Sequence, residues 1–98
     1  MAKVVWTGPA LAQLEAIADV IAVDKPEAAC AVVRRIFEKT DQLQKFKNLG
    51  RPIPEFQHPG YRQLWIKPCW IYYRTDRESV VILHVRRSEK LLDLGDLS

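Results

Sequence analysis

Arginines and a histidine in the second half of the chain carry side chains that can bind anions. Arg62 and Arg74 fall on two stretches that read as strands. A guanidinium group in such a place can bind the carboxylates of a partner protein or the phosphates of RNA. It can also pair within the chain, with Glu55, Asp76 or Glu78. The sequence leaves these interpretations of the two strand arginines equally open.

A basic cluster, Arg86, Arg87 and Lys90, begins at the end of the last predicted strand. Such a charge run is usually a solvated end of the chain. We interpret it as a functional surface only if other evidence implies a partner that binds there. His84 stands just before the cluster in a β-branched strand. A single histidine in that setting is more often a hydrogen-bonded structural residue than a general base.

Three apolar side chains are candidates for contact with a partner. Trp65 alternates with Leu64 and Ile66, so it falls on the other face of their strand. An outward-facing tryptophan is a candidate hot spot for binding. Leu91 and Leu92 follow the basic cluster, and they either pack on the protein or form an apolar surface for a partner.

The composition is that of an ordinary globular protein. The 98 residues are 48% hydrophobic and 28% charged, so we expect one domain over residues 1–98 without extensive disorder. The net charge of +3 permits an acidic partner or nucleic acid but requires neither. The two cysteines have no metal or redox spacing, and no signal peptide or membrane-spanning run is apparent. We therefore expect a soluble cytoplasmic protein without a metal or cofactor.

Hydrophobic periodicity predicts the elements that must position these side chains. A strand over residues 3–7 precedes two amphipathic helices, one over 9–23 and one over 26–47. The linker between the helices is so short that they must form an antiparallel hairpin. Residues 48–60 form a stiff loop, because prolines and glycines punctuate them.

Three strands joined by two tight turns follow, over residues 61–67, 70–75 and 80–85. Connections this short make an antiparallel meander. The order β-α-α-β-β-β predicts a two-layer α+β fold, in which the N-terminal strand joins the edge of a mainly antiparallel sheet. The helical hairpin covers one face of that sheet, and the other face is free to bind a ligand.

The sequences of several stretches, taken in order along the chain, resemble those of the RelE/ParE superfamily of bacterial type II toxins. The stretches are Val5-Trp6-Thr7, Gly50-Arg51-Pro52, Tyr61-Arg62-Gln63-Leu64, Trp70-Ile71-Tyr72-Tyr73-Arg74 and Val81-Ile82-Leu83-His84-Val85-Arg86-Arg87. No single motif is specific, but together they cover nearly the whole chain. The resemblance implies the same β-α-α-β-β-β fold that the periodicity predicts.

The superfamily contains two activities, and the residues favour one of them. RelE-like members cleave mRNA on the ribosome, which needs groups that move protons and stabilise charge on the phosphate. Such members usually carry an arginine where this chain has Trp70, and some place a general base where it has Ile53. They often have a tyrosine or histidine near the carboxyl terminus, and this chain has neither after His84. The resemblance therefore implies the ParE-like branch, whose members inhibit DNA gyrase by binding and need no catalytic group.

The resemblance also implies an antitoxin that wraps the toxin in a hetero-oligomer and pairs an acidic tail with its basic residues. The expected partner-binding residues are Arg62, Trp65, Arg74, Arg86, Arg87, Lys90, Leu91 and Leu92. Two alternatives remain open. One is an inactive relative that only binds its antitoxin. The other is a ribosome-dependent endoribonuclease that acts on mRNA, with a catalytic set of Arg62, Arg74, His84 and Arg86.

Overall fold

A computed structural model describes residues 1–88. The elements are β1 (Lys3–Trp6), α1 (Gly8–Asp24), α2 (Pro26–Asp41), a 3₁₀ turn (Gln42–Gln44), β2 (Arg51–Pro52), β3 (Tyr61–Ile66), β4 (Cys69–Thr75) and β5 (Ser79–Arg87). This order confirms the predicted α+β arrangement and adds one short strand, β2, inside the predicted loop. Neither helix of the described part has the length and apolar character needed to cross a membrane.

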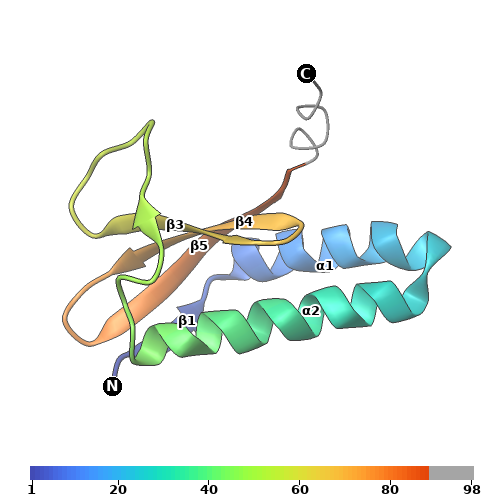
Figure 1. Ribbon diagram of the computed structural model, residues 1–98, viewed down its shortest axis with the longest axis horizontal. Helices are drawn as coiled ribbons and strands as arrows, with labels where there is room; N and C mark the ends of the chain where they lie inside the picture. Colours follow the sequence, from blue (N-terminus) through green and yellow to red (C-terminus); the bar gives the residue numbers. More distant parts are fainter. Residues whose placement is uncertain (89–98) are drawn as a thin grey trace.

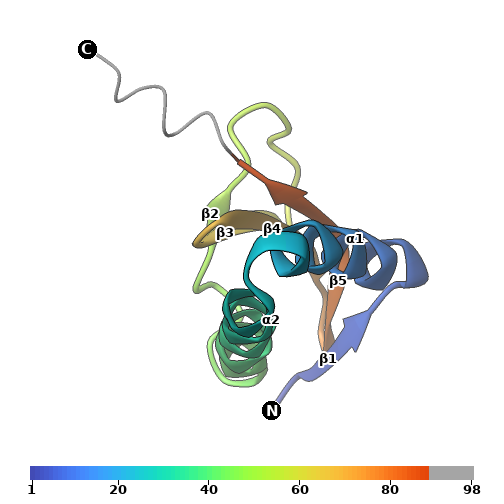
Figure 2. The same cartoon turned by 90° about the vertical axis from the view of Figure 1, so that its right-hand side faces the viewer.

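The five strands form one mixed sheet in the order β1-β5-β4-β3-β2. β1 lies at an edge, as predicted, and pairs in parallel with β5, while every other pairing is antiparallel. The two helices run side by side and pack on the sheet (Figure 1), and the end-on view shows the strands curving past α2 (Figure 2). The fold is therefore two-layered, with helices on one face of the sheet.

Helix boundaries follow local chemistry. α1 begins after Thr7, whose Oγ1 accepts a hydrogen bond from the Ala10 N–H at 3.3 Å. α2 ends at Asp41, so the prediction that it continues to residue 47 is wrong. The Thr40 hydroxyl donates to the Ile36 carbonyl at 2.9 Å, and a carboxylate at position 41 opposes the helix dipole. Phe46, which falls in the part of the predicted helix that does not form, is 59% exposed.

The core lies between the helices and the facing side of the sheet. Its largest fully buried side chains are Tyr73, Ile36, Leu43, Ile71, Ile82 and Val80. Cys69 is also fully buried, and burial raises the pKa of its thiol, an effect that the positive charge of Arg87 partly opposes. The thiol therefore stays protonated at neutral pH and packs as a small apolar group.

A β-bulge in β5 decides which side chains face away from the core. Tyr72 pairs with His84 and Tyr73 pairs with Ile82, so Leu83 is the additional residue. As a result Ile82 and Val85, three residues apart, are both buried in the core. His84 lies on the opposite face, next to Tyr72.

Candidate functional site: the open face of the sheet

The side of the sheet that faces away from the core, called the open face below, carries two rows of side chains in register. One row contains Arg51, Gln63, Tyr72 and His84, and the next contains Trp65, Trp70 and Arg86. Arg74 lies on the same face, two residues along β4 from Tyr72. Aromatic and cationic side chains dominate this surface, which suits it to anionic or aromatic partners.

His84 is held by a hydrogen-bond network with α1. The Val85 N–H, beyond the end of β1, donates to Gln13 Oε1 at 2.7 Å. This bond orients the carboxamide so that its amino group faces His84 Nδ1 at 3.1 Å and donates to it. Assigned from this network, the neutral imidazole carries its proton on Nε2. His84 is therefore placed as a hydrogen-bond donor and not as a general base.

Arg86 extends over the ring of Tyr72, which lies on β4 in the neighbouring row. Its Nη2 donates to the Tyr72 hydroxyl at 3.0 Å, and its guanidinium carbon lies 6.0 Å from the centroid of that ring. The same ring meets His84 edge to face at 5.6 Å. Arg86, Tyr72 and His84 thus form one exposed polar cluster near the end of β5.

The two strand arginines make different contacts. Arg74 pairs with Asp76 at 3.4 Å, an exposed ion pair of the kind that contributes little stability. The Ser79 hydroxyl, hydrogen-bonded to the Asp76 carboxylate, holds the pKa of that carboxyl below its usual value, and Arg74 adds to the effect. Arg62 follows the core-facing alternation, and its Nη1 donates to the Gly50 carbonyl at 2.8 Å. Arg62 therefore holds the loop before β2 and does not join Arg86 and His84.

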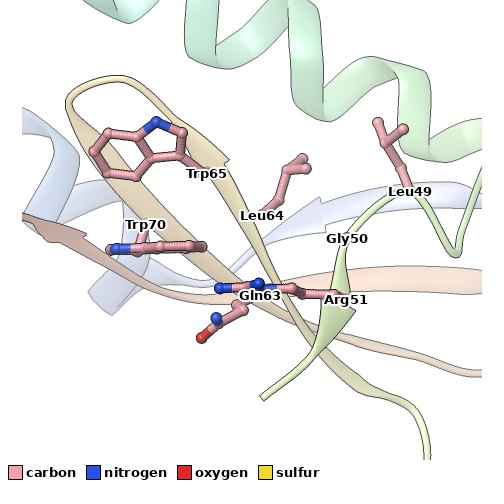
Figure 3. A pocket seen from close by; sticks show the side chains of 7 residues that line it. All are labelled: Leu49, Gly50, Arg51, Gln63, Leu64, Trp65 and Trp70. Atoms are coloured by element: carbon pink, nitrogen blue, oxygen red, sulfur yellow. The ribbon is translucent and has the colours of Figure 1, made fainter. Parts of the chain in front are cut away.

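A cavity of about 440 Å³ adjoins the two tryptophans (Figure 3). The rings of Trp65 and Trp70 lie 5.1 Å apart between centroids at a tilt of 51°. The Arg51 guanidinium lies 5.6 Å from the centroid of Trp70. Trp65, which the alternation places on the open face, thus belongs to an aromatic and cationic pocket, as a candidate contact residue would.

Gln63 lines the same cavity and was not singled out by its type or spacing. It is only 5% exposed, and within residues 1–88 its carboxamide makes no hydrogen bond. A buried polar group without a partner costs about 1–3 kcal/mol. The signal in the sequence was a glutamine that follows Arg62 in a strand whose other residues are aromatic or aliphatic, but strand alternation predicts an exposed position for it.

The remaining candidates lie at the end of β5 or beyond it. Arg87 is the last residue of β5. Its side chain is exposed, and it pairs with Cys69 of β4 in the strand register. Lys90, Leu91 and Leu92 lie outside the described residues.

A second surface lies between the two helices. A groove of about 480 Å³ is lined mainly by small and apolar side chains, with one acidic and one basic residue among them: Ala18, Asp19, Ala22, Pro26, Ala29, Cys30, Val33 and Arg34. Small residues such as Ala22 and Ala29 let another backbone approach closely. Val23, near the tip of the hairpin, is 87% exposed. The surface of the hairpin is thus apolar enough to accept an amphipathic segment.

An αα-hairpin packed on a five-stranded mixed sheet, with a cationic open face, defines the fold of the RelE/ParE superfamily of toxins. The family model described as ParE toxin of type II toxin-antitoxin system, parDE, matches residues 4–92. The chain belongs to this ParE toxin family.

Relatives and a solved structure agree with this assignment. Toxin ParE3 of Caulobacter vibrioides is 33% identical over 86 residues, which cover 87% of this chain and 85% of the relative. Toxin RelE2 of the same organism is 34% identical over 93 residues, which cover 93% of this chain and all of the relative. A solved structure of the chromosomal ParDE TA system from P. aeruginosa superposes with a TM-score of 0.75. It is 34% identical and is matched over 91% of this chain and 98% of the other.

Proposed function

We propose that this toxin acts in the cytoplasm by binding DNA gyrase without catalysis, and that a cognate antitoxin neutralises it. The observation that carries the proposal is that the four nuclease candidates do not form a complete catalytic set. Arg62 is bonded to the Gly50 carbonyl on the core-facing side, while His84 presents a protonated Nε2 on the open face. Arg74, His84 and Arg86 share the open face, but Arg62 does not join them and His84 is not placed as a general base, which supports inhibition by binding.

The purified chain is expected to inhibit supercoiling by gyrase, and Arg86→Ala is expected to raise the half-inhibitory concentration about tenfold or more. Arg86 is exposed, and its guanidinium is pre-oriented by the Tyr72 hydroxyl, as in arginines that dominate binding energy. Arg77→Ala is the matched control, because it removes the same charge from the turn before β5. Gel assays of plasmid topology measure both variants.

Intact supercoiling together with new transcript ends at codon-phased positions would contradict this proposal and favour the ribonuclease alternative. The relative named RelE2 and the cluster of Arg86, Tyr72 and His84 give that alternative its support. Sequencing of mRNA 5′ ends after induction of the toxin alone decides between the two activities.

The groove between α1 and α2 is the proposed dock for an amphipathic helix of the antitoxin. Ala22→Arg places a long charged side chain in this groove, and we expect it to weaken antitoxin binding about a hundredfold because the helix can no longer approach. Ala16→Arg, at an exposed position of α1 outside the groove lining, is the control. Isothermal titration measures both affinities, and equal affinities would place the antitoxin elsewhere.

A further inference from the structure

Within residues 1–88, the buried carboxamide of Gln63 makes no hydrogen bond, although it can both donate and accept. Buried polar groups in proteins are nearly always hydrogen-bonded. This side chain is almost fully buried on the open face, flanked in its row by Arg51 and Tyr72, yet neither donates to it nor accepts from it. A buried donor and acceptor without partners at the wall of a cavity indicate a ligand that supplies both.

The surroundings of Gln63 restrict what that ligand can be. Figure 3 shows Trp65 and Gln63 extending from the same side of β3, with the Arg51 guanidinium lying between Trp70 and the Gln63 carboxamide. Within residues 1–88, that guanidinium makes no hydrogen bond or ion pair, so only its contact with the Trp70 ring holds it. A flat conjugated ring can replace it on the indole, because both stack on aromatic faces.

We propose that this pocket binds an unpaired nucleobase together with its phosphate, with adenine as the preferred base. Adenine presents a donor beside an acceptor, which a glutamine carboxamide matches with two hydrogen bonds. The base would stack on Trp70, and the displaced Arg51 would bind the phosphate, helped by Arg86 in the row of the tryptophans. This binding activity goes beyond gyrase inhibition and does not depend on it.

A peptide satisfies the observations less well. A peptide group could bond to the Gln63 carboxamide, but it offers no flat conjugated ring for the tilted pair of indoles. Among residues 1–88, the ionisable side chain that lines the cavity is the cationic Arg51, which favours an anionic ligand. Base, phosphate and stacking surface together account for all the polar and aromatic groups of the pocket.

The indole N–H signals in a proton–nitrogen correlation spectrum test the proposal directly, because the chain has three tryptophans. AMP is expected to shift the signals of Trp65 and Trp70 with saturation. The signal of Trp6 is expected to stay in place, because that ring packs against Phe37 at 5.0 Å in the core. Adenosine has the base but no phosphate, and ribose 5-phosphate has the phosphate but no base. Each is expected to bind at least tenfold more weakly than AMP.

A single-stranded oligoadenylate distinguishes the two sources of such a ligand. Stronger binding of the oligonucleotide than of AMP would identify an exposed base in a nucleic acid strand, and equal binding would identify a free nucleotide. Absence of shifts with all of these ligands at millimolar concentration would overturn the proposal. So would shifts produced only by an extended peptide.

Two variants make the test independent of folding. Gln63→Met keeps the volume but removes the hydrogen bonds, so AMP affinity is expected to fall about tenfold while the melting temperature stays equal or rises. Gln42→Met, at an exposed glutamine after α2, is the control for the substitution itself. Trp70→Leu is expected to lose the stacking contact and weaken AMP binding about tenfold. Unchanged affinity in both pocket variants would contradict the assignment.

Discussion

Tyr73→Phe is expected to destabilise the protein by about 3 kcal/mol. The Tyr73 ring is fully buried, and its hydroxyl joins two parts of the loop before β2. It accepts from the Gly50 N–H at 2.8 Å and donates to the Lys47 carbonyl at 2.8 Å. Phenylalanine leaves both backbone groups without this partner, and each loss costs about 1–3 kcal/mol. Urea unfolding measures the change.

Tyr72→Phe is the matched control, because it removes a hydroxyl whose partner, Arg86, is exposed to water. We expect this variant to lose less than about 1 kcal/mol. Equal losses in the two variants would show that the Tyr73 hydroxyl does not hold the loop.

Alkaline pH gives a second readout of the same hydroxyl. Burial raises the pKa of Tyr73, while the hydrogen bond from Gly50 and the charge of Arg62 partly oppose this effect. In the unfolded chain the phenol titrates near pH 10. Stability is therefore full below about pH 10 and falls as the pH rises above it, because the unfolded chain releases this proton first. The variant Tyr73→Phe lacks this part of the loss, whereas the contribution of Cys69 is common to both proteins.

Gly50→Ala is expected to cost about 3 kcal/mol, the upper end of the usual range for forcing atoms into a packed site. A Cβ at this position would lie 2.5 Å from the Gln63 carbonyl oxygen and 2.8 Å from the Tyr73 hydroxyl. The first of these atoms belongs to the backbone of β3, so the loop itself must shift. The shift is expected to move Arg51 off Trp70 and to separate Arg62 from the Gly50 carbonyl.

Gly8→Ala provides the comparison, since a Cβ there would meet nothing within 4 Å. Gly8 is the first residue of α1, where alanine is the better helix former, so this variant is expected to be neutral or slightly stabilising. Melting temperatures of the two variants check the prediction. A loss in Gly50→Ala no larger than in Gly8→Ala would mean that the loop adapts to the added methyl group.

The elements of the fold were predictable because each leaves a local pattern. Apolar spacing located both helices, and β-branched and aromatic runs located β3, β4 and β5. β2 was missed because its two residues pair with β3 only through contacts made in the folded chain. The early end of α2 left no mark in the hydrophobic period, and the hydroxyl of Thr40, which bonds to the Ile36 carbonyl near that end, could not be read from apolar spacing.

The site was less predictable, because its geometry depends on contacts between residues that are distant in sequence. Type and spacing singled out Arg86 as a candidate, and strand alternation placed Trp65 on the open face. Alternation could not show that Arg62 would bond to a loop carbonyl or that Gln63 would be covered. Both outcomes depend on groups distant in sequence, and the bulge at Leu83 resets the alternation without a glycine or proline to mark it.

The parallel pairing of β1 with β5 bears on how the toxin is made in the cell. Val4 lies beside Val80, and the Thr7 hydroxyl donates to the Ile82 carbonyl across 75 positions of sequence. During translation β1 is synthesised first, but it has no strand to pair with until β5 leaves the ribosome. The helical hairpin can form early, whereas the open face, with Arg86 and His84 on β5, is assembled last. A nascent toxin therefore exposes its hairpin before its open face is complete, so an antitoxin that binds the groove proposed above can do so before the proposed gyrase-binding surface exists.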